Sequence, residues 1–433
     1  MIRLKARGAW FLALVLALSA PPASAQTAAG RVPITADNVA DLTLGYVLPT
    51  CQFNPDWTLV SDGRGVFDVQ TGKRRFVTFY SEDGGWFSPD GKWLQVGGLA
   101  SAEPSGTVYD VATGEISFDR TGVFSPDGRL FAVGSDAVYE AGTWKRLYAY
   151  GIGPTVFSPD GRWLTGDWLL DAAAGWQHFS ITGAPAVFSP DSTLLALFDG
   201  VHEVPSGVLR FAIHGTGGVS FSPDGTLLAV DNDGVYDVAT GERRFAIRYS
   251  GVFSPDGKLL AIAGDGVYDV ATGERRFALQ GDFAANSARF SPDGTLLVVE
   301  DDGVYDVAAG ERLFVPVMGY PQFSPDGTLL AVSYQSFGLV PTGDTGGGCF
   351  IYGAAENTWP VLGLIKPNSA TGVNIRRGPD RAVIESAKSK LIVFAQTADG
   401  GWYKIESGDG YGWVSAYAVQ PVFIPERLPV ENP

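Results

Sequence analysis

The sequence predicts an all-β protein built from many short strands, and three observations support this prediction. Of the 433 residues, 45% are hydrophobic and only 18% are charged, which excludes a wholly disordered chain. The 56 glycines and 27 prolines make nearly one residue in five a turn former, which favours strands joined by tight turns over long helices. One short string also recurs at a nearly constant spacing, which indicates a repeated structural unit.

Residues 1–25 have the pattern of an export signal. Three basic residues precede an apolar run over 9–20, and Ala-Ser-Ala over 23–25 matches a cleavage site. We expect cleavage between Ala25 and Gln26. An uncleaved anchor is the alternative, but it needs ~20 apolar residues, and the prolines at 21 and 22 end the run too early. We therefore expect an exported protein, in the periplasm, at the cell surface or outside the cell, with no later membrane span.

Repeats fill residues 26–352. The string FSPDG and its close variants occur nine times, at spacings of 31 to 37 residues, starting at Phe53 (FNPDW), Phe87, Phe124, Phe157, Phe188 (FSPDS), Phe221, Phe253, Phe290 and Phe323. A period of this length also occurs in helical repeats. The choice between helical and β-strand repeats therefore rests on the residue types within each unit. A helix would have to accommodate a proline in every unit, at a cost of ~3 kcal/mol each.

The unit that starts at Gly218 shows the expected strand pattern. It reads GVSFSPDG, TLLAVDNDG, VYDVATGE and RRFAI, which is four β-prone runs separated by turns. Ser-Pro-Asp-Gly suits a type I turn and Asp-Gly suits a type I′ hairpin. Four-stranded antiparallel units arranged around a ring form a β-propeller. The literal count is nine blades. An alternative of eight blades has a shared closing blade that includes a strand over 44–48.

The repeats resemble those of WD-repeat and TolB-type propellers, whose blades carry an FSPDG turn and a terminal W-D-V-A-T-G element. Here the second element is VYDVATG at Val235 and Val267, VYDVAAG at Val304, TVYDVATG at Thr107 and GVFDVQTG at Gly65. Tyrosine or phenylalanine stands where the family has tryptophan. The resemblance implies a propeller that acts as a platform for binding a protein, a peptide or another ligand.

Charge limits the partners. Residues 26–354 hold 20 basic and 39 acidic residues, a formal charge of −19, which excludes nucleic acid as a partner. In a propeller, the turns between second and third strands share one face. We expect that face to collect acids with few counter-charges, namely Asp62, Asp136, Asp167, Asp199, Asp231, Asp233, Asp265, Glu300, Asp301 and Asp302.

After residue 353 the repeats stop. A linker and the start of a second module are expected over 353–371, the module itself over 366–420, and a Pro-rich tail over 421–433. The motifs GVNIRRGP at Gly372, ADGGWYKI at Ala398 and GYGWVSAYAV at Gly410 occur in this order. They resemble the bacterial SH3-like domain, which is a small β-barrel. The resemblance implies attachment to the cell envelope or wall through peptidoglycan, another wall glycan or a protein.

Four aromatic residues of this module are the candidate ligand-binding residues that the resemblance implies: Trp402, Tyr403, Trp413 and Tyr417. Each tryptophan also suits the core of so small a barrel. Because side chains alternate along a strand, Tyr403 and Trp402 point to opposite sides, and Tyr403 is the better binding candidate.

Catalytic and metal-binding motifs are missing from the sequence. The three histidines show no metal-ligand spacing, and no G-x-S-x-G motif occurs. We therefore expect no catalytic residues, no metal and no cofactor. Calcium is an alternative because Asp-Asn-Asp-Gly over 231–234 resembles the start of a Ca²⁺ loop, although a hairpin explains it as well. A carbohydrate-active or peptidase-like enzyme with a site in the central channel is the alternative function.

Two further features stand out. Seven of the tryptophans lie between residues 57 and 176, in the first four units, and none lies between 177 and 358. This uneven distribution is explained either by drift or by a partner site on the diverged units. The two cysteines, Cys51 and Cys349, flank the repeat array. They form either a disulfide that joins its ends, or two buried thiols if an inner and an outer strand hold them too far apart.

Overall fold

The computed structural model describes part of the chain. The described residues are 31–39, 42–48, 50–79, 85–97, 106–134, 136–149, 155–181, 186–215, 217–249, 251–262, 264–279, 288–300, 302–314, 319–334, 348–354, 363–367, 373–376, 383–387, 391–396, 402–407 and 410–423.

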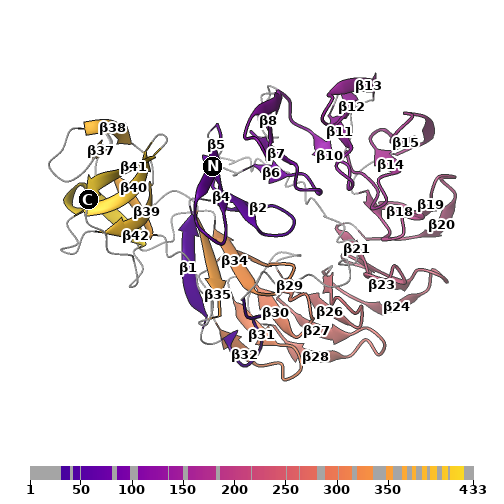
Figure 1. Ribbon diagram of the computed structural model, residues 1–433. Helices are drawn as coiled ribbons and strands as arrows, with labels where there is room; N and C mark the ends of the chain where they lie inside the picture. Colours follow the sequence, from indigo (N-terminus) through magenta and orange to yellow (C-terminus); the bar gives the residue numbers. More distant parts are fainter. Residues whose placement is uncertain are drawn as a thin grey trace, which may run out of the picture.

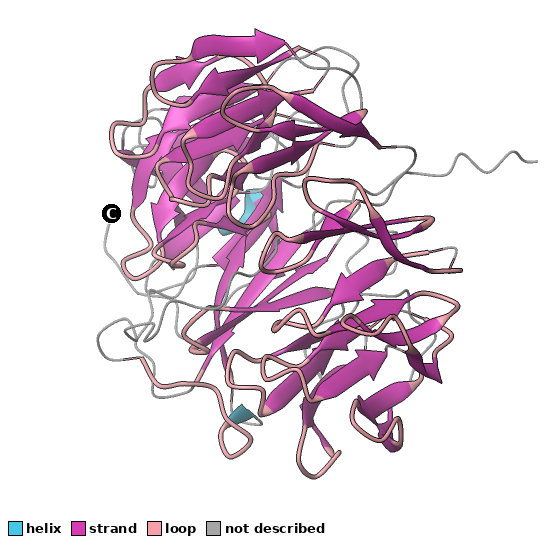
Figure 2. Ribbon diagram, turned by 90° about the vertical axis from the view of Figure 1, so that its right-hand side faces the viewer, coloured by secondary structure: helices cyan, strands magenta, loops and turns pink. Residues whose placement is uncertain are grey.

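Nine antiparallel sheets follow one another around a ring (Figure 1). Eight of them have four strands and one has three. Figure 2 shows that strands make up nearly all of the regular structure. The nine-bladed prediction is confirmed. The eight-bladed alternative is wrong, although the shared closing blade that it invoked is present.

Each blade is numbered in chain order and begins with its innermost strand. Blade one comprises β2 (Gln52–Phe53), β3 (Leu59–Ser61), β4 (Gly65–Asp68) and β5 (Arg74–Val77). Blade two comprises β6 (Trp86–Phe87), β7 (Trp93–Val96), β8 (Thr107–Asp110) and β9 (Ile116–Phe118). Blade three comprises β10 (Val123–Phe124), β11 (Leu130–Val133), β12 (Ala137–Glu140) and β13 (Lys145–Ala149). Blades four and five comprise β14 (Trp163–Thr165), β15 (Trp168–Asp171) and β16 (Gln177–Ser180); and β17 (Val187–Phe188), β18 (Leu194–Leu197), β19 (Gly200–Glu203) and β20 (Leu209–Ala212). In blade four a single bridge between Phe157 and Leu164 stands in place of the innermost strand.

Blades six to eight are the most regular. Blade six comprises β21 (Val219–Phe221), β22 (Leu227–Val230), β23 (Gly234–Asp237) and β24 (Arg243–Ala246). Blade seven comprises β25 (Val252–Phe253), β26 (Leu259–Ile262), β27 (Gly266–Asp269) and β28 (Arg275–Ala278). Blade eight comprises β29 (Ala288–Phe290), β30 (Leu296–Val299), β31 (Gly303–Asp306) and β32 (Arg312–Phe314).

The FSPDG string forms the first turn of each blade. In blade six the Ser222 hydroxyl donates to the Asp224 carboxylate (2.6 Å) and accepts from the amide of Leu227 (3.0 Å), so the turn satisfies its own polar groups. Gly225 ends the turn at φ +71°, and a Cβ there would lie 3.5 Å from Cδ of Pro190 in blade five. The turns of successive blades therefore pack on one another, which explains why the string recurs with so little change.

Blade nine closes the ring. It contains β33 (Tyr320–Phe323), β34 (Leu329–Tyr334) and β35 (Gly348–Gly353) from the end of the repeats, and β1 (Thr43–Leu48) from their start as the outermost strand. Leu48 pairs with Cys349 in this sheet. Upstream of β1, Ile34 and Val39 are buried against core residues of blades eight and nine. The two ends of the array are thus held by backbone pairing and by apolar contacts.

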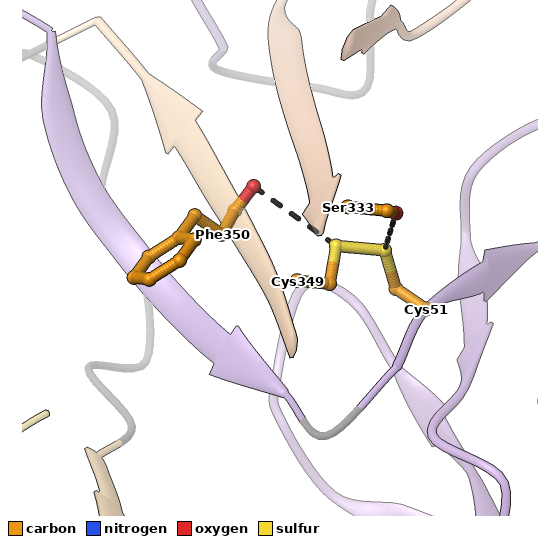
Figure 3. The surroundings of a disulfide bond; sticks show 4 residues. All are labelled: Cys51, Ser333, Cys349 and Phe350. Atoms are coloured by element: carbon orange, nitrogen blue, oxygen red, sulfur yellow. Dashed lines mark hydrogen bonds between the residues drawn. A yellow bond between two sulfur atoms is a disulfide. The ribbon is translucent and has the colours of Figure 1, made fainter. Parts of the chain in front are cut away.

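A disulfide also joins the two ends (Figure 3). Cys51 and Cys349 are bonded, with their Cα atoms 5.7 Å apart across a sequence separation of 298 residues, and the Ser333 hydroxyl lies 3.4 Å from the sulfur of Cys51. The alternative of two thiols held too far apart on an inner and an outer strand is wrong. Cys349 lies on β35, the third strand of blade nine, and Cys51 directly precedes the innermost strand of blade one.

The C-terminal segment forms a separate sheet of seven strands, ordered β38-β37-β41-β40-β39-β36-β42. In Figure 1 it lies beside β1, outside the ring. Its elements are β36 (Gly363–Pro367), β37 (Val373–Arg376), β38 (Val383–Ala387), β39 (Leu391–Gln396), β40 (Trp402–Ser407), β41 (Gly410–Ser415), the 3-10 turn η2 (Ala416–Ala418) and β42 (Val419–Phe423). The strands extend beyond the expected 366–420 at both ends, because β36 and β42 pair with each other.

Candidate functional site on blades four and five

Large apolar side chains exposed to solvent gather on two neighbouring blades. Of eleven such side chains among the described residues, five belong to blades four and five: Trp168, Trp176, Phe198, Val208 and Leu209. Trp176 is the most exposed of the eleven, at 71%. Exposed aromatic residues are frequent anchors of protein interfaces. These two blades are therefore the candidate functional site.

The regular blades show what blades four and five have changed. On the face that carries the turns between second and third strands, here called the second-turn face, an aspartate accepts bonds from a tyrosine three residues later and an arginine ten residues later. In blade six the Tyr236 hydroxyl lies 2.5 Å and the Arg243 guanidinium 3.1 Å from the Asp233 carboxylate. The same triad occurs in blade three (Asp136, Tyr139, Arg146), blade seven (Asp265, Tyr268, Arg275) and blade eight (Asp302, Tyr305, Arg312).

These triads correct the expectation that acids on the second-turn face have few counter-charges. The arginines come from the fourth strand of each blade and reach the carboxylates across the sheet edge. Burial alone would raise the pKa of Asp233, but bonds from the Tyr236 hydroxyl, the His214 amide and the Arg243 guanidinium together lower it. Asp62 of blade one differs, because burial raises the pKa of its carboxyl despite bonds from the amides of Arg64 and Gly65.

Glycine has a steric role in the triad. In blade six, a Cβ on Gly234 would meet Cδ of Arg243 at 2.5 Å, because the arginine side chain crosses over this glycine to reach the aspartate. Gly266 of blade seven lies under Arg275 in the same way, with a distance of 2.6 Å. In blade three Ala137 stands at this position and Arg146 still reaches Asp136, so a small side chain is compatible with the triad, whereas a large one competes with the arginine stem for the same space.

Blade four has replaced the glycine, the tyrosine and the arginine of the triad blades. Trp168 stands at the glycine position, Gln177 at the arginine position and Leu170 at the tyrosine position. Trp168 is 40% exposed, and the neighbouring Asp167 is exposed and forms none of the ion pairs found among the described residues. Blade four thus presents an indole and a carboxylate side by side where the regular blades present a neutralised triad.

Blade five has lost the triad in another way. His202 replaces the tyrosine and Leu209 replaces the arginine, with the side chain of Leu209 over Gly200. The imidazole Nε2 of His202 lies 2.9 Å from the Asp199 carboxylate, and its Nδ1 lies 3.2 Å from the carbonyl oxygen of Gly207. The Asp199 side chain remains 67% exposed. Phe198, just before it in the same turn, is 45% exposed.

On the opposite face, blades four and five also differ from the rest. Trp176 and Val208 occupy the turn position that holds Lys73, Glu115, Glu242, Glu274 or Glu311 in other blades. Two apolar pairs therefore mark this sector, Trp168 with Phe198 on one face and Trp176 with Val208 on the other. The uneven tryptophan distribution left open a partner site somewhere on the first four blades, with drift as the alternative, and blade four is one of these. Blade five was not predicted as a binding site, because its changes introduce no tryptophan.

The candidate residues of the C-terminal module are distributed differently. Trp402 is partly exposed, whereas Tyr403 and Trp413 are buried, at 9% and 5% exposure. Burial therefore contradicts the preference for Tyr403, which points inward from β40 while Trp402 points outward. Tyr417 belongs to η2, but its side chain lies outside the described part of the structure.

Among the described residues, no group of three or more histidine, cysteine, aspartate or glutamate side chains is arranged to hold a metal ion. Asp231 to Asp233 form the turn between β22 and β23, and Gly234 begins β23. The Asp233 carboxylate accepts a hydrogen bond from Arg243 of its triad. The described part of the chain contains no helix of the length and hydropathy needed to cross a membrane.

Comparisons with known proteins extend this description. No family model and no curated protein matches the chain. Similar solved structures include the C-terminal WD40 domain of Sif2 (12% identity, 72% of this chain and 97% of that one, TM-score 0.41) and a eukaryotic initiation factor (16%, 69% and 83%, TM-score 0.38). Another is the hydrazine synthase of Kuenenia stuttgartiensis (18%, 60% and 96%, TM-score 0.33). The assignment as a β-propeller of antiparallel blades rests on the strand order of the chain itself.

Proposed function

We propose that this protein is an exported, non-enzymatic scaffold whose propeller binds a protein partner. The observation that carries the proposal is the exposed aromatic surface of blades four and five. Regular blades cover their second-turn face with neutralised triads, while these two blades lack the triad and expose Trp168, Phe198 and Leu209 there; on the opposite face they expose Trp176. Keeping apolar side chains in water is unfavourable, so a partner that covers them supplies a physical reason for their presence.

Affinity capture with the full mature chain tests this function. The bait is compared with a Trp168→Ser, Trp176→Ser double variant and with a Tyr320→Ser control, since Tyr320 is 52% exposed but belongs to blade nine. We expect one or more proteins from an envelope extract to be retained by the wild type and the control and lost by the double variant. Equal retention by all three baits would remove blades four and five as the binding site.

The C-terminal module is proposed to attach the scaffold to the envelope. Its support is the order of the three SH3-like motifs and the partly exposed Trp402 on β40. The test is co-sedimentation of the full mature chain with purified peptidoglycan, beside a Trp402→Ala variant and a known wall-binding protein. Retention of the wild type and release of the variant are expected. Failure of the wild type to sediment where the known binder does would refute the attachment.

Export and the TolB-type character of the repeats are part of the same proposal. The supports are the signal pattern over 1–25 and the FSPDG turns with their VYDVATG strands. Expression of the whole chain in a bacterium, followed by N-terminal sequencing of the product, tests export. A mature protein that begins at Gln26 outside the cytoplasm is expected, and an uncleaved cytoplasmic product would contradict it.

A further inference from the structure

On the second-turn face, blades four and five each present a carboxylate that lacks the arginine found in the regular blades. Asp167 and Asp199 occupy the position of Asp233, where the Arg243 guanidinium lies 3.1 Å away in blade six. Gln177 and Leu209 stand where that arginine begins. Neither acid is compensated by another arginine or lysine among the described ion pairs, and only Asp199 has a partner there, His202.

Apolar surface flanks both carboxylates. Trp168 follows Asp167 directly and is 40% exposed, and Phe198 precedes Asp199 and is 45% exposed. Leu209, at 48% exposure, has its Cδ1 2.5 Å from the position of a Cβ on Gly200, along the path that the arginine stem follows over Gly234 in blade six. In blade five Leu209 therefore takes the place of the apolar stem of the missing arginine, and the guanidinium group is absent.

The charge of the sector favours a cationic partner. Residues 155–213, which form blades four and five, hold six acidic residues and two arginines. A neutral glycan can stack on Trp168, but it leaves the carboxylates without a counter-charge. A guanidinium serves both features, because it pairs with a carboxylate through two parallel hydrogen bonds and stacks on an aromatic face.

We propose that blades four and five bind a polypeptide segment that presents arginine side chains next to apolar residues, with the guanidinium groups taking the places of the missing internal arginines at Asp167 and Asp199. This rests on the proposed function, that the propeller binds a protein partner, and adds the chemistry of the partner. The repeat itself supplies the precedent, because blade six shows how an arginine reaches the equivalent carboxylate.

The test restores the internal arginines. The probe is a labelled synthetic nonapeptide in which arginine alternates with leucine and serine, and its matched control has citrulline, which is neutral and of the same shape, at every arginine. The restored protein carries Trp168→Gly and Gln177→Arg in blade four and His202→Tyr and Leu209→Arg in blade five, which are the residues of the regular blades. A charge-matched control carries Ala239→Arg and Ala271→Arg, at exposed turn positions of blades six and seven on the opposite face.

Binding is measured by fluorescence anisotropy at low ionic strength on the full mature proteins. We expect the arginine peptide to bind the wild type and the charge-matched control at least tenfold more tightly than the restored protein, and the citrulline peptide to bind all three weakly. Circular dichroism and thermal melting confirm that the restored protein is folded.

Three outcomes would overturn the inference. The first is equal binding of the arginine and citrulline peptides, and the second is equal binding of the arginine peptide by the restored and wild-type proteins. The third is displacement of the bound arginine peptide by neutral wall oligosaccharides. Retention of an envelope protein that still depends on Trp168 and Trp176 would in those cases preserve the proposed function. If neither the arginine-dependent peptide binding nor the tryptophan-dependent retention of an envelope protein is observed, the inference and the proposed function are both rejected.

Discussion

At the scale of single residues, Trp57 shows how the ring closure departs from the repeat. It stands at the glycine position of the first turn and has φ +56°, a conformation that costs a side chain about 1–2 kcal/mol. Its ring stacks on Phe53 with centroids 3.8 Å apart, and it is buried with Leu48, Cys51 and Cys349. The burial of a large aromatic side chain at the closing interface offsets the backbone strain.

Replacing Trp57 by glycine therefore has two opposing effects. Removal of the buried ring costs ~3–5 kcal/mol, and relief of the strained φ returns about 1–2 kcal/mol. We expect the Trp57→Gly variant to lose about 1–4 kcal/mol of unfolding free energy in urea, as the difference of these two terms.

Ser192 provides the matched control, because it occupies the same turn position in blade five with φ +63° and accepts a hydrogen bond from the Asp160 amide at 3.1 Å. Strain relief and the lost bond nearly cancel in Ser192→Gly, so a change within about 0.5 kcal/mol is expected. Equal losses in the two glycine variants would show that Trp57 does not stabilise the closure.

At the scale of the blade, the triad of aspartate, tyrosine and arginine is the unit that the second-turn face repeats. It is anchored in three different parts of the blade, since the acid lies in a turn, the tyrosine on the third strand and the arginine on the fourth. Such a contact ties the outer edge of a blade to its turn. Blades four and five lack this contact and expose apolar side chains on the same face.

The energetic role of the triad is tested by Arg243→Leu, which copies the residue found in blade five. The Asp233 side chain is only 6% exposed, so loss of its cationic partner leaves a buried carboxylate less well compensated. We expect a loss of about 1–3 kcal/mol in urea unfolding at pH 7. The control is Arg244→Leu, which breaks a more exposed pair with Asp237, and there a loss below ~1 kcal/mol is expected. The reverse order would contradict a role for the triad.

The tyrosines of the triad predict a loss of stability at alkaline pH. Burial, the hydrogen bond to Asp233 and the charge of that carboxylate raise the pKa of Tyr236 to about 12, and burial with Asp265 raises the pKa of Tyr268 to about 12. The unfolded chain loses these protons near the ordinary value of 10.0. Stability from these groups is therefore complete below pH 10 and falls as the pH rises from about 10 to 12.

Urea unfolding at a series of pH values from 9 to 12 checks this prediction. The double variant Tyr236→Phe, Tyr268→Phe has no phenol to titrate at these two sites, so its unfolding free energy should decline less steeply above pH 10 than that of the wild type. Parallel curves for the two proteins would mean that the phenols titrate alike in the folded and unfolded states.

The blades were predictable from sequence because their turns are local. Ser-Pro-Asp-Gly closes its own hydrogen bonds within six residues, so the string marks a turn wherever it occurs. The triads were missed because each joins residues ten positions apart, across a hairpin. Their signal was nevertheless present, since an aspartate with a tyrosine at +3 and an arginine at +10 recurs in four units. The alternation at Trp402 and Tyr403 was predictable, but which of the two faces inward depends on the whole sheet.

At the scale of the whole molecule, the central claim is that the chain forms a closed ring of nine blades. Closure depends on β1, which pairs with β35 from Thr43 opposite Gly353 to Leu48 opposite Cys349, with one register shift between Leu44 and Tyr46. No such pairing is encoded by local turns, because its partners are about 300 residues apart. The disulfide between Cys51 and Cys349 forms only if the first and last blades meet.

The number of free thiols in the purified protein tests this claim most directly. The protein is unfolded without reductant, its thiols are titrated, and a proteolytic digest is searched by mass spectrometry for linked peptides that contain Cys51 and Cys349. We predict no reactive thiol per chain and a linked pair within single molecules, with two thiols after reduction. Two reactive thiols in the unreduced protein, or a linkage only between different chains, would contradict the closed ring described here.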